Sequence, residues 1–112
     1  MKTDVSFIIS IDSSFEMTNN FFEHLLQNEF ALNSEIIVVL DSITNCYTIK
    51  YIKQLNKYEN IKIYILDQKV GYGKANNYAV KQAQNNILYF INTDVFAEKD
   101  CFEKMLLVCN PY

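Results

Sequence analysis

The sequence predicts a three-layer α/β/α sandwich with a mainly parallel sheet, formed as a single domain by residues 1–112. Two observations indicate this fold class. Short apolar runs alternate with helical patterns in the order β-α-β-α-β-α-β-α, and 112 residues are enough to bury a core. Right-handed crossovers between parallel strands then place helices on both faces of the sheet.

The apolar runs are the expected strands, at residues 5–11, 35–40, 61–66 and 87–91. The first and last show little polar alternation, which is typical of strands buried on both faces. We therefore expect residues 5–11 inside the sheet and residues 87–91 as its central strand. The third run alternates more, which favours a place nearer the sheet edge.

Amphipathic stretches between the runs predict four helices: one after the polar turn 12–14, and others at about 45–58, 72–84 and 98–108. Alanines spaced four apart on the third helix make a slim face that can pack close to a sheet. The side chains expected to point inward are Phe21, Phe22, Leu25, Leu26, Ile49, Ile52, Leu55, Ala75, Ala79, Ala83, Phe102, Met105 and Leu106.

The charge pattern argues against nucleic-acid binding. The formal net charge is -3, and all basic residues are lysines that are spread thinly along the chain. No cluster could follow a phosphate backbone. An anionic ligand would therefore need help from a metal ion or from backbone N–H groups.

The cysteines Cys46, Cys101 and Cys109 are odd in number and form no close CxxC pair, which indicates reduced structural thiols in a cytoplasmic protein. The only histidine, His24, lies on another predicted helix, so a zinc site is not expected. We expect His24 to be a partly exposed helix residue. No apolar stretch is long enough to span a bilayer, and the first residues lack a signal-peptide core.

A carboxylate follows each predicted strand: Asp12, Asp41, Asp67 and Asp94. In a parallel sheet all four would lie at one end, where open α/β sheets bind their ligands. Polar residues belong in such turns anyway, so each carboxylate alone has a plain explanation. Asp41 and Asp94 stand out because each follows a buried run, and we interpret Asp94 as a metal or diphosphate contact.

The only two glycines lie in the run Gly-Tyr-Gly-Lys at 71–74. A P-loop is excluded because Lys74 is followed by Ala75 instead of Ser or Thr. The dinucleotide fingerprint also fails, since position 76 is Asn and the run follows the third strand. A tight turn that lets a ligand approach the backbone remains, with Lys74 near a helix N-terminus. A plain turn is equally compatible with the residues.

Together these segments resemble the nucleotide-binding half of the family 2 glycosyltransferases, which have the Rossmann-like GT-A fold. The resemblance rests on the opening strand 5–9, the strand 35–39, the run Gly-Tyr-Gly-Lys-Ala-Asn-Asn at 71–77, and Phe-Ile-Asn-Thr-Asp-Val at 90–95. The last run is similar to the DXD motif, in the Asn-x-Asp form of the rhamnosyltransferase-like branch. The resemblance covers nearly the whole chain.

The resemblance implies a nucleotide-diphospho-sugar donor, and Mg²⁺ or Mn²⁺ as cofactor. Asp94 would bind the cation that bridges the diphosphate, and Asp41 would accept a hydrogen bond from the base. The full set of residues implied to contact the nucleotide is Ser10, Asp12, Asp41, Gly71, Lys74, Asn77, Asn92 and Thr93. The family usually has Pro at position 10, Tyr-Asn at 12–13 and Asn at 69, where this chain has Lys69.

The catalytic base of inverting family members lies well after the DXD segment, so we expect a truncated donor-binding domain that contains no catalytic residue. The full-length enzyme would act on a glycan or lipid-linked acceptor, at the inner face of the membrane. Uncovered apolar surface makes a homo-oligomer plausible. The alternative is a non-catalytic α/β module for protein contacts. A phospho-acceptor receiver domain ranks lower, because it needs an acidic pair after the first strand.

Overall fold

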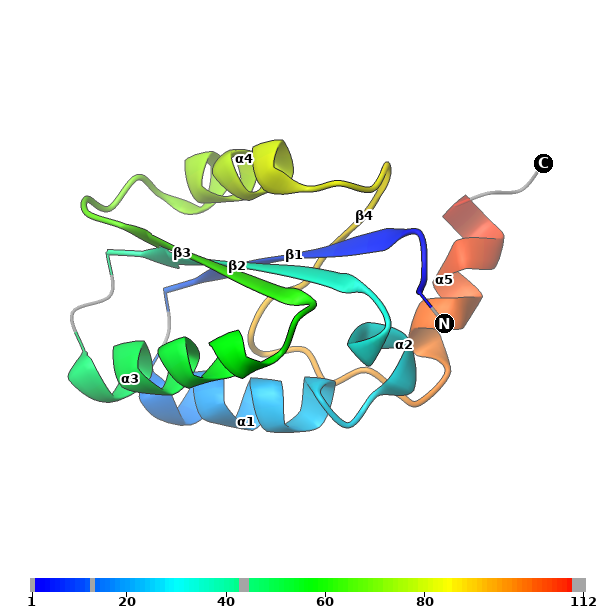
Figure 1. Ribbon diagram of the computed structural model, residues 1–112, viewed down its shortest axis with the longest axis horizontal. Helices are drawn as coiled ribbons and strands as arrows, with labels where there is room; N and C mark the ends of the chain where they lie inside the picture. The colour runs from blue at the N-terminus through cyan, green and yellow to red at the C-terminus, as the bar shows by residue number, and fades with distance from the viewer. Residues whose placement is uncertain (1, 13, 43–44, 110–112) are drawn as a thin grey trace.

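The computed structural model describes residues 2–12, 14–42 and 45–109, and it has three layers (Figure 1). Helix α4 covers one face of the sheet, and α1 and α3 cover the other. The strands are β1 (Val5–Ile11), β2 (Glu35–Asp41), β3 (Ile61–Leu66) and β4 (Ile87–Phe90). The helices are α1 (Phe15–Leu25), α2 (Glu29–Leu32), α3 (Cys46–Gln54), the 3₁₀ turn η1 (Leu55–Lys57), α4 (Tyr72–Gln82) and α5 (Cys101–Cys109). The predicted fold class is confirmed.

Polar side chains start the helices. Ser14 accepts a hydrogen bond from the Met17 N–H at the start of α1, and Asn45 accepts from Tyr47 and Thr48 at the start of α3. Asn28 caps the short helix α2 in the same way. The sequence prediction missed α2, although Asn28 followed by Glu29 is a helix-start signal.

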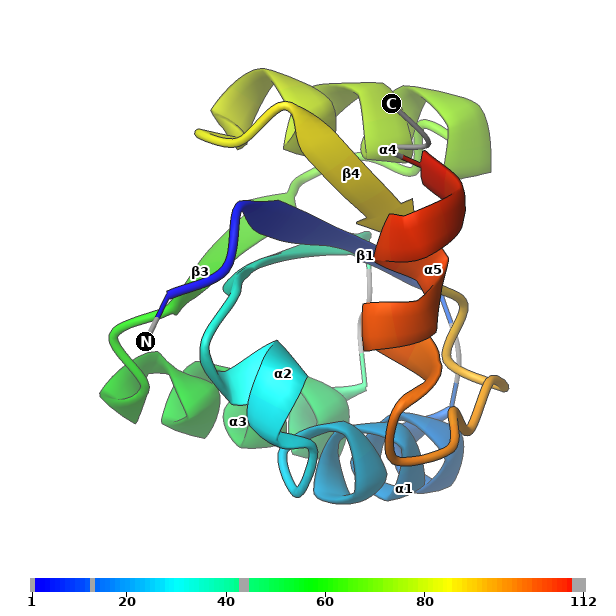
Figure 2. The same cartoon turned by 90° about the vertical axis from the view of Figure 1, so that its right-hand side faces the viewer.

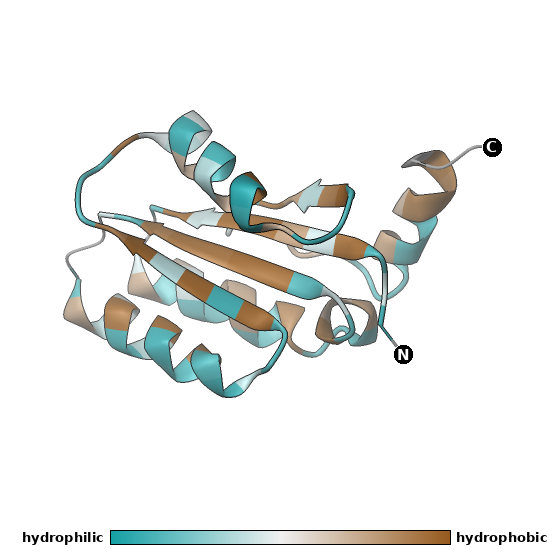
Figure 3. Cartoon of the chain, turned by 45° about the horizontal axis from the view of Figure 1, so that its top comes forward, coloured by the Kyte–Doolittle hydropathy of each residue, from teal (hydrophilic) through white to brown (hydrophobic). Residues whose placement is uncertain are grey.

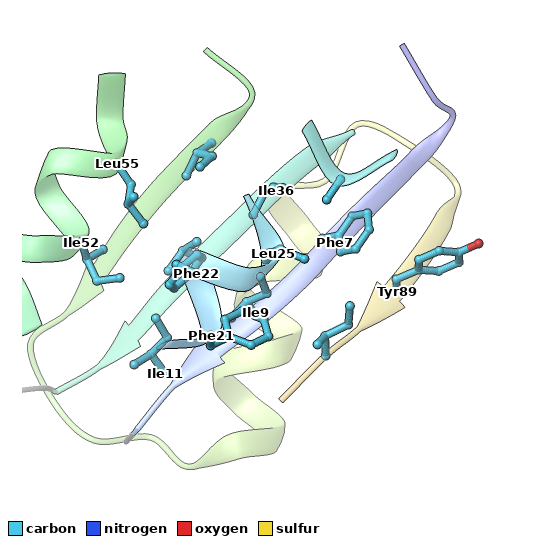
Figure 4. Packing of buried hydrophobic residues seen from close by; sticks show 14 of the residues in the cluster. Phe7, Ile9, Ile11, Phe21, Phe22, Leu25, Ile36, Ile52, Leu55 and Tyr89 are labelled. Carbon is cyan, nitrogen blue, oxygen red and sulfur yellow. The ribbon is translucent and has the colours of Figure 1, made fainter. Parts of the chain in front are cut away.

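The sheet alternates its side chains between two apolar layers. Phe7, Ile9 and Ile11 of β1 face α1 and α3, where they pack with Phe21 and Phe22 (Figure 4). Ile8 faces the other way, into a smaller cluster that contains Ile37, Val39, Ala75 and Ala79. The small alanine face of α4 therefore packs against the sheet as predicted. In Figure 3 the apolar residues concentrate along the strands and α4 is mostly polar, whereas the end of α5 is apolar, with Leu107 and Val108 exposed.

The expected inward side chains are mostly confirmed. Among the exceptions, Leu26 and Ile49 are only half-buried against the larger cluster, and Met105 is exposed. No helix in the described ranges has the length and apolar character needed to cross a membrane.

The prediction that residues 87–91 form the central strand is wrong for this sheet. The strand order is β3-β2-β1-β4, all parallel, so β4 pairs with β1 alone among the described strands. Tyr89 is buried on the α1 side, but Phe90 on the opposite side is 52% exposed. Helix α4 packs on β1 and β2 and leaves Phe90 uncovered. A run of apolar residues does not reveal how far a covering helix extends.

The strand order places a switch point beside β1. The chain passes from β1 to β2 and β3 through helices on one face, then returns through α4 on the other face to put β4 on the far side of β1 (Figures 1 and 2). Open α/β sheets bind ligands in the crevice outside the carboxyl ends of the strands at such a point. The ends of β1 and β4 therefore define the place to look for a site.

Candidate donor-binding site

The carboxyl ends of β1, β2 and β3 form one rim, at the left in Figure 1, and β4 ends earlier, with Phe90 in register with Ile8. Ile11 of β1 is in register with Leu40 of β2, and Asp41 is in register with Leu66 of β3. Asp12, Asp41 and Asp67 thus follow one another across the rim. Asp12 and Asp67 are exposed, whereas Asp41 is 2% exposed, so the three carboxylates have different surroundings.

Asp41 holds the loop between β3 and α4. Its Oδ1 accepts a hydrogen bond from the Val70 N–H at 2.8 Å, and its Oδ2 accepts from the Gly71 N–H at 2.9 Å. A buried carboxylate needs such partners to offset its lost hydration. This double contact was not foreseen from the sequence, and it gives Asp41 a structural role in addition to the predicted base contact, which stays a prediction.

Gly71 turns the chain into α4 with a backbone that only glycine adopts readily. Its φ is 91° and its ψ is 163°, and it is the N-cap of the helix. No side chain of the described residues caps α4. The N–H groups of the first turn are therefore not used by a cap and lie at the positive end of the helix dipole. Of the turn predicted at 71–74, only Gly71 has a turn conformation, because residues 72–74 already form the first turn of α4.

Asp12 and Lys69 form an ion pair across the rim. Asp12 follows β1 and Lys69 lies in the loop between β3 and α4, so the pair spans the end of β2 between them. Both side chains are more than half exposed. The hydrogen bond to Asp12 raises the pKa of Lys69, although some loss of hydration opposes it. Lys69 stands where the family usually has Asn, and its pairing with Asp12 was missed at the sequence level.

The segment after β4 reaches the same rim. The Tyr72 hydroxyl, on the first residue of α4, donates a hydrogen bond to Asn92 Oδ1 at 2.8 Å. Asn92 and Asp94 are exposed, and Thr93 between them is buried. Asp94 is therefore open to solvent two residues from a contact with the start of α4.

The remaining predicted residues lie around these contacts. Ser10 is half-buried near the end of β1. Lys74 and Asn77 are exposed on the first two turns of α4, and their neighbour Asn76 is buried. The predicted residues thus lie at or after the carboxyl ends of β1, β2 and β4 and at the N-cap and on the first two turns of α4. Hydrogen bonds and an ion pair connect some of them to Val70, Tyr72 and Lys69, which the sequence prediction did not include.

His24 lies near the end of α1, away from this rim, whereas Cys46 begins α3 on the same side of the molecule as the rim (Figure 1). His24 is exposed, its Nε2 is 2.9 Å from the Ala97 carbonyl oxygen, and its ring contacts the Phe96 ring. Its interpretation as a partly exposed helix residue is confirmed. Cys46 and Cys101 are free thiols, and the side chain of Cys109 lies outside the described part of the structure.

The family of the chain follows from a sequence comparison. Residues 6–109 match the profile described as Glycosyl transferase family 2. The chain belongs to glycosyl transferase family 2. The family match covers the whole rim, from Ser10 at the end of β1 to Asp94. No curated protein matches the sequence.

Solved structures similar to this family 2 chain share its fold. S. aureus TarS 1-349 in complex with UDP-GlcNAc aligns with a TM-score of 0.82 and 24% identity over 99% of this chain. The mannosyltransferase PcManGT from Pyrobaculum calidifontis, in complex with GDP-Man and Mn²⁺, aligns with a TM-score of 0.75 and 13% identity over 89% of this chain. The family 2 chain covers 32% and 30% of those two chains. At these identities the similarity shows the GT-A fold alone.

The residues of the family 2 rim fit a cation that is shared with a ligand. Within the described ranges, no three His, Cys, Asp or Glu side chains gather into a group that could hold a metal ion. Asp94 offers one exposed carboxylate, the hard oxygen ligand that Mg²⁺ and Mn²⁺ prefer. Mg²⁺ is commonly bound by one or two carboxylates together with substrate phosphates. The donor set therefore fits a cation that arrives with a diphosphate.

Proposed function

We propose that this chain is the donor-binding region of a glycosyltransferase that transfers a sugar from a nucleotide-diphospho-sugar to an acceptor hydroxyl. The observation that carries the proposal is a series of contacts that links the end of β2 to the segment after β4. Asp41 fixes Gly71, and the next residue, Tyr72, contacts Asn92 at the start of Asn92-Thr93-Asp94. The switch point, the start of α4 and the exposed Asp94 are thus brought to one side of the sheet.

In this proposal the nucleoside lies against the ends of β1 and β2. Ser10, Asp12 and Asp41 border the base there. Asp41 retains lone pairs beyond those used by Val70 and Gly71, because a carboxylate has about four acceptor positions. One of these can accept a hydrogen bond from an N–H group of the base, such as an imide N–H.

The diphosphate would lie between α4 and the segment after β4. The Tyr72 and Gly73 N–H groups at the start of α4 favour an anion, and Lys74 adds a positive charge at the same end. Gly71, Asn77, Asn92 and Thr93 would line this part of the site. Asp94 would hold Mg²⁺ or Mn²⁺, which neutralises the negative charge that builds on the leaving nucleoside diphosphate.

We assign the donor to the nucleotide-diphospho-sugars as a class. The TarS and PcManGT structures contain UDP-GlcNAc and GDP-Man, respectively, which supports a nucleotide-diphospho-sugar in general. The rhamnosyltransferase-like branch suggested by the Asn-x-Asp form has no support among these structures. A glycan or lipid-linked acceptor, a cytoplasmic location at the inner membrane face and a base outside this chain stay predictions. Self-association also stays a prediction, favoured by the exposed Phe90 on the outer strand.

Metal-dependent nucleotide binding tests the proposal. UDP, dTDP and GDP are titrated into the chain with Mn²⁺ and with EDTA. We expect at least one nucleotide to bind more tightly with Mn²⁺, and Asp94→Ala to remove that difference. Asp67→Ala is the matched control, because Asp67 is also an exposed carboxylate after a strand on the same rim. No binding of any nucleotide, or equal metal dependence in Asp94→Ala, would contradict the proposal.

A non-catalytic module is the alternative, and one observation favours it. The Asp12–Lys69 ion pair crosses the rim at positions where the family usually has other residues. If this pair closes the base site, Lys69→Asn should restore nucleotide binding that the wild-type chain lacks. If the site is open, the wild-type chain binds and Lys69→Asn changes affinity only modestly.

A further inference from the structure

Tyr72 makes an exposed side-chain hydrogen bond to the segment after β4. It is the first residue of α4, its side chain is 55% exposed, and its hydroxyl donates to Asn92 Oδ1 across a sequence separation of 20 residues. Exposed side-chain hydrogen bonds contribute little to stability, because water competes for both partners. The contact therefore matters more for where it holds Asn92 than for folding.

The contact determines which end of the Asn92 amide faces outward. An asparagine side chain has one acceptor, Oδ1, and one NH₂ group with two donor hydrogens. Oδ1 is the atom that could ligate a cation, and here one of its two acceptor positions takes the Tyr72 hydroxyl hydrogen. The NH₂ group is the end left to meet an anion or a hydroxyl oxygen. Asn92 is thus oriented as a hydrogen-bond donor.

The position of Tyr72 is itself set by the rim. Gly71 precedes it with a backbone that turns into the helix, and the Gly71 N–H is held by the buried carboxylate of Asp41. Asp41, Gly71, Tyr72 and Asn92 therefore form a continuous series of contacts from the end of β2 to the segment after β4. A shift at Asp41 would move the phenol hydroxyl and release the amide.

We propose that Tyr72 is a positioning residue of the donor site, which holds Asn92 so that its NH₂ group donates to an oxygen of the nucleoside diphosphate and leaves the cation to Asp94. The inference rests on the function proposed above. It assigns a role to a residue that the sequence prediction did not select. Within the Asn-x-Asp motif, Asn92 is then the hydrogen-bond donor and Asp94 the cation ligand.

The test compares Tyr72→Phe with Tyr78→Phe, which removes a hydroxyl from the same helix. Tyr78 packs its ring against Tyr64, a contact that phenylalanine retains. The side-chain NH₂ signal of Asn92 in an ¹⁵N–¹H spectrum is assigned by its loss in Asn92→Asp. UDP and GDP are then added in EDTA, and again with Mg²⁺. Melting temperatures of all variants are recorded.

In the wild-type chain and in Tyr78→Phe, we expect the nucleotide to shift the Asn92 NH₂ signal even without metal. In Tyr72→Phe the signal should move before any ligand is added. Nucleotide affinity should fall about 3- to 10-fold with and without Mg²⁺, the loss of one hydrogen bond, at an unchanged melting temperature.

Three results overturn the inference, in two distinguishable ways. If nucleotide shifts other rim signals, such as the Gly71 N–H, but leaves Asn92 NH₂ unmoved, or if Tyr72→Phe binds like wild type, the role of Tyr72 is wrong and the donor site stands. If no nucleotide moves any signal of the wild-type chain, the donor site and the role of Tyr72 both fail.

Discussion

The buried carboxylate of Asp41 accepts the backbone N–H of Gly71 at 2.9 Å, across 30 residues of sequence. This contact ties the end of β2 to the start of α4, and Val70 adds a second hydrogen bond to the same side chain. Because β2 is an interior strand, the contact fixes the loop that carries Lys69, Gly71 and Tyr72 relative to the sheet. The position of the loop between β3 and α4 therefore depends on the Asp41 side chain.

Asp41→Asn tests how much the rim depends on that carboxylate. The asparagine amide has one acceptor oxygen and one donor NH₂ group. One of the Val70 and Gly71 N–H groups therefore loses its acceptor and faces the NH₂ group. We expect the free energy of unfolding to fall by about 1–3 kcal/mol, the cost of an unsatisfied buried donor. Urea denaturation measures it. Asp67→Asn at the same rim should change stability by no more than about 0.5 kcal/mol, because Asp67 is exposed. Equal effects of the two substitutions would refute a structural role for Asp41.

The two glycines of the turn should respond to alanine in opposite ways. At Gly71 an added Cβ meets no atom within 4 Å, but the φ of 91° is strained for any other residue. Gly71→Ala should therefore cost about 1–3 kcal/mol. Gly73 lies within α4, also with open space around an added Cβ. Gly73→Ala should be neutral or stabilise by up to about 1 kcal/mol, because alanine is the better helix former. Thermal unfolding of both variants decides it, and destabilisation by Gly73→Ala would count against the assigned helix start.

Glu35 at the opposite end of β2 makes stability depend on pH. Burial raises its pKa, but hydrogen bonds from Lys62, Ser6 and the Gln84 N–H outweigh it and hold the pKa of Glu35 below the ordinary 4.5. Since the folded pKa is the lower one, the stabilisation is complete above the unfolded value and is lost as pH falls through the folded value.

The measurement is urea unfolding of wild type and Glu35→Gln from pH 7 down to pH 3. The wild-type chain should lose part of its stability in the acid range, and Glu35→Gln should be less stable at pH 7 and lose less on acidification. Glu59→Gln, an exposed carboxylate next to the start of β3, should keep the wild-type pH profile. A Glu35→Gln profile parallel to that of wild type would show that Glu35 is not the titrating group.

Manganese should locate the cation. Because the described residues offer no group of three acidic, His or Cys ligands, Mn²⁺ alone should bind weakly, and nucleotide should strengthen its binding. Paramagnetic broadening of amide signals should then concentrate at residues 92–95 and 71–74, and it should require UDP or GDP. Asp94→Ala should remove the broadening, while Asp67→Ala retains it. Broadening without nucleotide, or centred elsewhere, would exclude Asp94 as the ligand.

The fold was predictable because its signals are local. Apolar runs separated by polar turns located every strand, and Ser14 and Asn45 marked helix starts that the structure confirms. The fold class and the family followed from those runs and from the motifs at 71–77 and 90–95. The place of β4 was not predictable in this way. Phe90 is as apolar as the buried residues around it, and its exposure depends on where α4 lies.

The candidate site divides in a similar way. Asp41 and Asp94 could be selected from the sequence because each acidic residue follows an apolar run. Lys69 and Tyr72 could not be selected, because nothing local distinguishes them from other surface side chains. Their importance comes from Asp12 and Asn92, which are distant in the chain and meet them only at the rim.

By itself the sequence determined the order of the elements, the end of the sheet where the acidic residues gather, and the family to which the chain belongs. Only the tertiary structure decided that β4 lies at an edge, that Asp41 accepts the Val70 and Gly71 N–H groups, and that the Tyr72 hydroxyl donates to Asn92. The physical reason is the distance along the sequence over which each feature is determined. Strand and helix patterns arise from neighbouring residues, whereas the partner of a hydrogen-bonding group is set by how the whole sheet brings distant segments together.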